Sequence, residues 1–377
     1  MKSFWKFTVF SLFFGLILLY NGNGQAAVTG GFPRSSILIE AKTGRVLYEN
    51  NAHEPLPMAS TTKIMTALVA LENGNPDDLV TTGANAFGVP GTSIYLSLGE
   101  QLPLRDMLYG LMLASGNDAA VAIAEHIGGD VDSFCQMMNK RAADIGCEDT
   151  VFATPHGLPA NNHHTTARDL AMIAREAMRN PAFREIVSTQ RASIPWEGHD
   201  YDRILNNKNK LLSEYPGAIG VKTGYTKAAG RCLVFAAERD GLELIGVVLN
   251  CPDWFQEAEA LLDKGFDNWQ MVSLLSAGET VRNIPVKNGI ADTVRVVAQG
   301  DVSAPVRIDA WPDLVLELPD SLNAGIKQGD VIGTAKLTDH GQTLITVPLA
   351  AAENVPERSF QYGWKRLAEQ WPLAAGE

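Results

Sequence analysis

Residues 57–64, Pro-Met-Ala-Ser-Thr-Thr-Lys-Ile, carry a serine and a lysine at a spacing that suits nucleophilic chemistry. The apolar run over residues 64–71 predicts a helix that starts at the serine and covers residues 60–72. Residues three apart share one helix face, so the Lys63 amine should lie over the Ser60 hydroxyl. A serine becomes a good nucleophile when a base takes its proton, and a desolvated lysine is such a base. The alternative is a serine N-cap with a solvated lysine.

A second motif, Ser115-Gly116-Asn117, stands between two apolar stretches that predict helices over residues 104–114 and 119–126. Its side chains are therefore expected at a tight junction between buried helices. The Ser115 hydroxyl can relay a proton to a leaving amine, and the Asn117 amide can fix Lys63 and a substrate amide. The alternative for Ser115 is a helix N-cap without a chemical role.

A third motif, Lys222-Thr223-Gly224, lies in a predicted strand over residues 219–226. Lys222 offers a positive charge and Thr223 a hydroxyl, which together suit a substrate that ends in a carboxylate. Gly224 has no Cβ, so a substrate backbone can lie along this strand. The backbone N–H groups of Ser60 and Tyr225 would then be the two donors to an oxyanion. The alternative for Lys222 is a charge at a strand edge.

The composition excludes one class of partner. The chain has 377 residues, which is enough for two domains, and its 46% hydrophobic and 20% charged content is typical of a globular protein. The formal net charge is −12. A protein without a basic excess cannot neutralise phosphates, so no nucleic acid is expected to bind.

The N-terminus has the pattern of an export signal. Lys2 and Lys6 precede an apolar stretch over residues 7–20, and Ala26-Ala27 offers a small-residue cleavage site. The sequence therefore predicts an exported, extracytoplasmic protein from which the signal peptide, residues 1–27, is removed. An uncleaved membrane anchor is the alternative, although the apolar stretch is short for a membrane span.

The order of elements predicts the fold class. A strand hairpin over residues 36–49 comes first, helices follow, and strands return over residues 219–250 before an amphipathic helix over residues 253–271. We expect an antiparallel sheet whose first and last strands meet, covered by a helical layer, in an α/β (α+β) domain of residues 28–272. Short strands separated by Gly, Asp, Asn and Pro then predict a small all-β domain over residues 273–356.

The C-terminal stretch, residues 357–377, predicts an amphipathic helix. Phe360, Trp364, Leu367 and Trp371 form one helical stripe, with basic residues beside it. Such a helix suits peripheral contact with a membrane interface. The alternative is that the stripe packs on the β domain.

The four cysteines are expected to be free thiols. Cys135 and Cys147 are separated by most of a predicted helix, which is too far for a disulfide. Pairing of Cys232 with Cys251 stays open but is not favoured, because a hairpin that turns at residues 240–241 places Cys232 opposite Leu249.

Three histidines, His156, His163 and His164, raise the alternative of a zinc site. Adjacent histidines point in different directions, and no acidic residue and histidine at helical spacing accompany them. We therefore expect structural or loop roles for them, and no metal.

Taken together, the three motifs indicate a known family. In this order they resemble the motif set of penicillin-binding proteins and class A β-lactamases, in which Asp stands at the centre of the middle motif where this chain has Gly116. The stretches 57–68, 111–120, 155–158 with 166–169, and 215–226 extend the match, so that the chain resembles the D-alanyl-D-alanine carboxypeptidases, the low-molecular-mass penicillin-binding proteins of bacteria. The resemblance covers nearly the whole chain, including the β domain and the terminal helix.

The resemblance implies a β-lactamase/transpeptidase-like catalytic domain that works without a cofactor. The implied reaction removes the terminal D-alanine from peptidoglycan stem peptides through an acyl-enzyme on Ser60, on the periplasmic or cell-wall side of the cytoplasmic membrane. β-Lactam antibiotics are implied as acylating inhibitors.

Three other functions are compatible with parts of the same pattern. A D,D-endopeptidase on peptidoglycan cross-links shares all three motifs and ranks second. A β-lactamase ranks third, because the string that best matches the class A glutamate motif, residues 202–206, begins with Asp and lies close before Lys222. A silent scaffold is disfavoured by the intact motifs.

Overall fold

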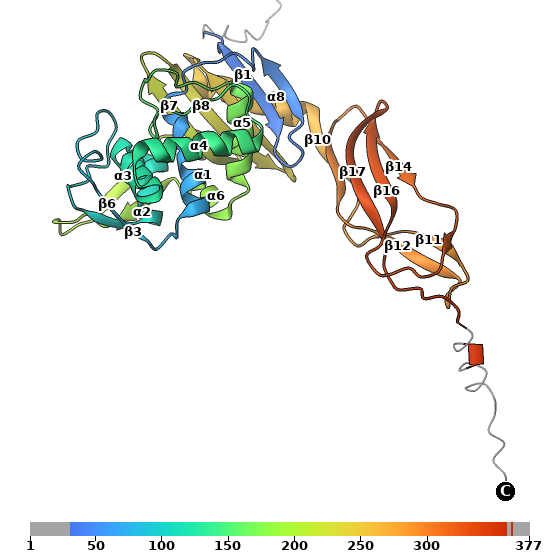
Figure 1. Cartoon of the computed structure of the whole chain (residues 1–377). Helices are drawn as coiled ribbons and strands as arrows, with labels where there is room; N and C mark the ends of the chain where they lie inside the picture. Colours follow the sequence, from blue (N-terminus) through green and yellow to red (C-terminus); the bar gives the residue numbers. More distant parts are fainter. Residues whose placement is uncertain (1–30, 360–362, 365–377) are drawn as a thin grey trace, which may run out of the picture.

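The computed structural model describes residues 31–359, 363 and 364 (Figure 1). The predicted signal peptide and most of the predicted terminal helix lie outside the described residues. No helix among the residues that the structure describes is long and apolar enough to span a membrane.

A five-stranded antiparallel sheet forms the centre of the first domain, in the order β2-β1-β9-β8-β7. Its strands are β1 (Ser35–Glu40), β2 (Val46–Asn50), β7 (Ala218–Thr226), β8 (Gly230–Arg239) and β9 (Leu242–Leu249). Strand β1 pairs antiparallel with β9, with Ile37 opposite Val247. The predicted meeting of the first and last strands is therefore confirmed. Strand β7, which carries the third motif, lies at the edge of the sheet.

Helices cover both faces of this sheet (Figure 1). On one face lie α1 (Lys63–Asn73), α2 (Leu104–Tyr109), α3 (Asn117–Gly128), α4 (Val131–Ile145), α5 (Ala167–Met178) and α6 (Pro181–Ser188). Helix α8 (Trp254–Asn268) packs on the other face, so the domain has a separate apolar core on each side of the sheet. The structure confirms the predicted antiparallel sheet with a helical layer.

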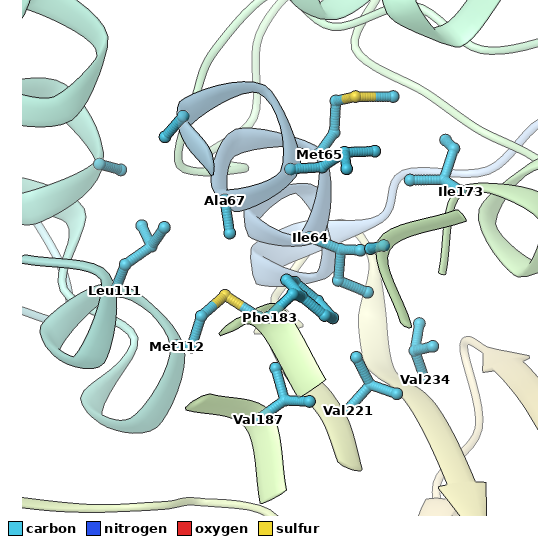
Figure 2. Packing of buried hydrophobic residues seen from close by; sticks show 14 of the residues in the cluster. Ile64, Met65, Ala67, Leu111, Met112, Ile173, Phe183, Val187, Val221 and Val234 are labelled. Carbon is cyan, nitrogen blue, oxygen red and sulfur yellow. The ribbon is translucent and has the colours of Figure 1, made fainter. Parts of the chain in front are cut away.

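Helix α1 runs through the middle of the larger core. Figure 2 shows its apolar side chains between Leu111 and Met112 on one side and Phe183 and Val221 on the other. Ile64, the first apolar residue of α1, is fully buried. Burial of these side chains fixes the start of α1 relative to the sheet, and therefore also fixes Lys63, the first residue of this helix.

The predicted helix start at Ser60 is wrong in detail. Ser60 lies in a short 3-10 helix, Ala59–Thr62, and the α-helix begins at Lys63. Two threonine hydroxyls bond back to carbonyls three residues earlier: Thr61 Oγ1 to Met58 O at 2.6 Å and Thr62 Oγ1 to Ala59 O at 2.8 Å. These bonds favour the tighter 3-10 geometry at the helix entrance.

Two strand hairpins and a π-helical turn were not predicted. The hairpins are β3 (Leu79–Thr81) with β4 (Gln101–Pro103) and β5 (Arg191–Ile194) with β6 (Arg203–Asn206), and a short helix, α7 (Leu211–Glu214), follows. The predicted helix over residues 104–114 changes to π geometry at Gly110–Ala114. These strands are three or four residues long, which is too short for an alternating pattern to be recognised.

The second domain is all-β, as predicted. Its strands are β10 (Trp269–Leu275), β11 (Thr280–Lys287), β12 (Thr293–Ala298), β13 (Val302–Arg307), β14 (Asp313–Glu317), β15 (Leu322–Asn323), β16 (Val331–Asp339) and β17 (Gln342–Ala351). The predicted helix over residues 253–271 is wrong at its end, because β10 begins at Trp269 and pairs with β13. We therefore propose a domain boundary near Asn268, slightly before the predicted one.

The turn between β1 and β2 touches the second domain. The Lys42 ammonium donates to Ser303 Oγ at 2.8 Å, and the Arg45 guanidinium donates to Pro305 O at 2.7 Å. Arg45 also lies 4.7 Å over the Trp269 ring. These contacts add to the covalent connection between α8 and β10.

All four cysteines are free. Burial raises the pKa of each thiol, to about 11 for Cys135 and Cys251 and to about 12 for Cys147 and Cys232. The predicted register of the β8–β9 hairpin is also confirmed, since Leu233 lies opposite Val248.

A buried ion pair ties the β5–β6 hairpin to the loop before β4. Arg203 Nη2 lies 2.9 Å from Glu100 Oε1, and the two side chains are only 4% and 0% exposed. Glu100 also accepts a bond from the backbone N–H of Ser97 at 2.8 Å. Removal of one partner would leave the other charge buried without compensation.

We predict that Arg203→Met lowers the free energy of unfolding by about 3–5 kcal/mol, because the Glu100 carboxylate stays buried without its cation. The measurement is urea denaturation followed by circular dichroism. The double variant Arg203→Met/Glu100→Gln should recover a large part of the loss. As a control, Lys140→Met removes an exposed ion pair with Asp144 and should cost less than about 1 kcal/mol. Equal midpoints for Arg203→Met and Lys140→Met would contradict the prediction.

Candidate active site

The turn that carries Ser60 is held in an unusual backbone conformation. Ala59, the residue before it, has a φ of 49°. Non-glycine residues adopt such angles rarely, and strained backbone of this kind clusters at functional sites. Two glycines lie against this turn: a Cβ added at Gly157 would sit 1.9 Å from Ala59 O, and one added at Gly224 would sit 2.9 Å from Ser60 N. Only residues without a side chain fit at these two positions.

The Lys63 amine joins the first two motifs. Lys63 Nζ lies 3.0 Å from Ser60 Oγ, 2.8 Å from Asn117 Oδ1 and 2.7 Å from His156 O. An uncharged amine has two N–H donors and one lone pair. The carbonyl oxygens of Asn117 and His156 can accept the two N–H bonds, which leaves the lone pair for the Ser60 hydroxyl.

The surroundings of Lys63 favour this uncharged form. The side chain is fully buried. Burial lowers the pKa of the Lys63 amine well below its usual range, and the nearby charges of Lys222 and Lys208 lower it further, whereas Asp118 acts in the opposite direction. A lysine with a depressed pKa can take a proton from a serine at neutral pH.

The second motif is fixed by the loop before it. Asn117 N donates to Thr92 O at 2.7 Å, and Asn117 Nδ2 donates to Pro90 O at 2.7 Å. Ser115 is buried, and its φ of 66° turns the chain from the π-helical turn into α3. The structure therefore brings Asn117 to Lys63 as predicted, with Ser115 two residues away at the same junction.

The role of Asp118 is not apparent from the sequence. Its buried carboxylate accepts from the backbone N–H groups of Ile94 and Leu96, both at 3.1 Å, and from Ser93 Oγ at 2.5 Å. Asp118 therefore anchors the same loop, residues 90–97, that Asn117 contacts, and the two residues are neighbours at the start of α3. The sequence did offer one signal for this role, because Asp118 is a charged residue next to a motif and inside an apolar helical region.

The sequence also did not predict that His163 supports the turn that carries Ser60. The backbone N–H of Ala153 donates to His163 Nδ1 at 3.0 Å, so the proton of the neutral ring is on Nε2. His163 Nε2 then donates to Thr62 Oγ1 at 2.9 Å, and Thr62 Oγ1 donates to Ala59 O. Burial lowers the pKa of His163 to about 4, which keeps the ring neutral.

The contacts of His156, His163 and His164 are the structural and loop contacts that the sequence predicts. His156 Nδ1 accepts from Leu158 N at 3.1 Å, and burial lowers the pKa of His156 to about 4. His164 pairs through its backbone with Val151. Among the described residues, no group of three or more His, Cys, Asp and Glu is placed to hold a metal ion.

The third motif lies on β7 beside the Ser60 turn. Lys222 is buried, and its ammonium donates to Thr223 O at 3.1 Å. Burial lowers the pKa of Lys222 to about 7, and the charge of Lys208 contributes. Tyr225 is 62% exposed, and the residue before it, Gly224, is the part of β7 that lies against the Ser60 turn.

The open edge of β7 completes the arrangement. Within the described sheet, β7 pairs with β8 alone, so an extended peptide can pair with its other side. A nucleophile with a buried base, a cationic contact at one end and a free strand edge together suit acyl transfer from a peptide. The geometry of the site is therefore consistent with the acyl transfer that the three motifs predict.

Comparisons with known proteins give the same result. The D-alanyl-D-alanine carboxypeptidase family model matches residues 31–253, and the model of the penicillin-binding protein 5 C-terminal domain matches residues 269–357. The chain is 33% identical over 349 residues to the D-alanyl-D-alanine carboxypeptidase DacF of Bacillus subtilis, covering 90% of each chain. It is 33% identical over 347 residues to DacC of Escherichia coli, covering 87% of this chain and 85% of the relative.

Solved structures extend the comparison to the fold. Penicillin-binding protein 5 from Haemophilus influenzae superimposes with a TM-score of 0.74 at 30% identity, covering 86% of this chain and 98% of that chain. The relatives named above are carboxypeptidases, which favours this activity over an endopeptidase or a β-lactamase. The chain belongs to the D-alanyl-D-alanine carboxypeptidase family of serine enzymes.

Proposed function

We propose that this serine carboxypeptidase removes the terminal D-alanine from peptidoglycan stem peptides, with Ser60 as nucleophile and Lys63 as its base. The observation that carries the proposal is the buried Lys63 amine, which lies 3.0 Å from Ser60 Oγ. Its two N–H groups can donate to Asn117 Oδ1 and His156 O, so that its lone pair can accept the serine proton. Penicillins and other β-lactams would acylate the same serine and act as inhibitors.

In the acylation step, Lys63 takes the proton of Ser60 while the serine oxygen attacks the carbonyl carbon of the penultimate residue. The backbone N–H groups of Ser60 and Tyr225 stabilise the oxyanion. Collapse of this intermediate breaks the amide bond, and Ser115 relays a proton to the departing D-alanine amine. Water then hydrolyses the ester, which restores Ser60 and releases the shortened peptide acid.

Substrate recognition rests on the third motif. The Lys222 ammonium and the Thr223 hydroxyl bind the terminal carboxylate, and the substrate backbone pairs with β7 at Gly224. Asn117 holds the Lys63 amine and binds the substrate amide. An enzyme that requires a free carboxylate next to the scissile bond acts as an exopeptidase.

We predict that Ser60→Ala abolishes both covalent labelling by fluorescent penicillin and D-alanine release, with activity lower by at least about 10³-fold. The measurements are gel fluorescence after penicillin treatment and an assay of free D-alanine from a peptide that ends in D-Ala-D-Ala. Ser213→Ala, which changes an exposed serine, is the matched control and should keep full activity. Penicillin labelling of the Ser60→Ala protein would disprove the assignment.

A pH dependence follows from Lys222. Its pKa of about 7 means that the ammonium is charged below this pH and loses its charge above it. The KM for a peptide with a free carboxylate should therefore rise as the pH increases through about 7, and the KM for the corresponding amide should not. Protonation of Lys63 at low pH should lower kcat for both peptides. Identical pH profiles of KM for acid and amide would contradict the role of Lys222.

The same proposal includes export and a site of action on the periplasmic or cell-wall side of the cytoplasmic membrane. Its support is the N-terminal sequence pattern and the nature of the substrate. Peripheral membrane contact through the predicted helix over residues 357–377 rests on the stripe of large apolar residues in the sequence.

We predict that deletion of residues 360–377, which leaves the β domain complete, moves the exported protein from the membrane fraction to the soluble fraction. The measurement is fractionation with penicillin labelling as the readout, so that only folded enzyme is counted. Unchanged partition would favour packing of the stripe on the β domain.

A further inference from the structure

Three aromatic side chains gather at the tip of the β5–β6 hairpin, which the proposed reaction does not use. The rings of Trp196 and His199 are stacked, with their centroids 4.3 Å apart and their planes at 30°. The Tyr201 ring stands edge-on to both, at 5.8 Å from Trp196 and 5.2 Å from His199 between centroids. Trp196 is half-buried, whereas His199 and Tyr201 are exposed. Ring surface at the tip is therefore open to a ligand.

The tip is fixed to the rest of the domain by Arg203. The guanidinium of Arg203 lies 4.9 Å from the centroid of the Trp196 ring and forms the buried ion pair with Glu100. Across the hairpin, the Ser193 hydroxyl donates to Asp202 Oδ2 at 2.8 Å. An array of rings that is already fixed loses little conformational freedom when it binds a ligand.

A hollow of about 660 Å³ lies between this tip and the β3–β4 hairpin. This volume is within the range of small-molecule sites, about 300–1,000 Å³. Besides the three rings, the lining includes apolar surface from Leu79 and Pro195 and polar side chains from Gln101, Glu197 and Asp200. The hollow therefore offers both apolar contact and hydrogen-bonding groups.

The chemistry of the tip narrows the class of ligand. Residues 195–202 include three carboxylates and no lysine or arginine, so the tip repels phosphates, anionic polymers and anionic membrane surfaces. Aromatic faces beside carboxylates and an amide suit a neutral ligand with C–H groups on one face and hydroxyl or amide groups at its edge. An N-acetylated pyranose sugar has this arrangement, and its amide N–H can donate to a carboxylate.

The position of the hairpin indicates how such a sugar is presented. In Figure 1 the hairpin projects from the end of the first domain that lies opposite the second domain. Its base reaches the catalytic site, because Lys208 contacts Thr92, whose carbonyl accepts the backbone N–H of Asn117. At about 3.4 Å per residue, Tyr201 lies at most about 25 Å from Lys208 along the chain. A sugar polymer that carries peptides is long enough to occupy the tip and the catalytic site together.

We propose that the tip of the β5–β6 hairpin binds the N-acetylated glycan strands of peptidoglycan and holds the enzyme on its polymeric substrate. The exposed rings of His199 and Tyr201 stack on the sugars, and the polar groups of the hollow bind hydroxyl and acetamido groups. The choice of peptidoglycan as the source of the sugar rests on the proposed function, because the stem peptides are attached to this glycan. Binding itself uses no residue of the three motifs.

The test uses the full chain and chitohexaose, a neutral oligomer of N-acetylglucosamine without a peptide, in isothermal titration calorimetry. Wild type is compared with Tyr201→Ala, Tyr201→Phe, His199→Ala and Trp311→Ala. Trp311 is an aromatic residue of the second domain that is 83% exposed, so Trp311→Ala is a matched control for the loss of an exposed ring. Cellohexaose, which lacks acetamido groups, and hexalysine test other ligand classes. Thermal unfolding of each variant checks that the fold is intact.

We expect wild type to bind chitohexaose, and we expect Tyr201→Ala and His199→Ala to raise the Kd at least about fivefold, because a stacking ring is lost. Tyr201→Phe, which keeps the ring, should stay within about twofold of wild type, and Trp311→Ala should match wild type. Tyr201→Ala should also sediment less with insoluble peptidoglycan, while it releases D-alanine from a soluble peptide at the wild-type rate.

No binding of chitohexaose by wild type, or equal Kd values for wild type and Tyr201→Ala, would overturn the proposal. Binding of cellohexaose or hexalysine as tightly as chitohexaose would overturn the assignment to peptidoglycan glycan. Failure of the proposed function would look different, since wild-type enzyme would then release no D-alanine from the soluble peptide, whether or not it binds chitohexaose.

Discussion

The burial of the Lys63 amine is the constraint on which the rest of the site depends. A charged ammonium in this position would need an anion beside it, and the protein places carbonyl oxygens there instead. These oxygens come from Asn117 and His156, which are far from Lys63 in the sequence. The loop over residues 90–97, helix α3 and the loop over residues 153–158 must therefore all be in place before the amine is correctly held.

Close backbone packing is the second requirement. The Ser60 turn lies so near to β7 and to the loop at Gly157 that a methyl group at either glycine would collide with it. The positive φ of Ala59 costs free energy, and the hydrogen bonds from Thr62, supported by His163, hold the turn in that state. The nucleophile is thus positioned by backbone atoms and by neutral polar groups, with the ionic contacts left for the substrate.

Local patterns were enough to predict the three motifs and the sheet. Ser60 and Lys63 are three residues apart, and the strands that carry the third motif and its neighbours have clear apolar runs between turn residues. The 3-10 entrance to α1 was not predictable from periodicity, because it depends on two threonine hydroxyls that bond to nearby carbonyls. The helix over residues 253–271 was predicted too long, because the apolar strand β10 follows α8 without a break.

Contacts between distant segments explain the remaining omissions. The bonds that Asp118 makes to the loop over residues 90–97, and those that His163 makes to the Ser60 turn, follow only from the folded arrangement. The predicted link between Asn117 and Lys63 came from the family resemblance and from the position of the motif between two helices. The hydrogen bond between them, across 54 positions in the sequence, is a tertiary contact that no local pattern encodes.

The four free cysteines have a consequence for how the chain matures. Their raised pKa values keep them as thiols rather than thiolates, and only the thiolate attacks a disulfide or is readily oxidised. The fold therefore contains no disulfide whose reduction could unfold it, and it needs no disulfide-forming catalyst. Protection of the thiols begins only when they are buried, so an exported chain must fold before they pair with one another.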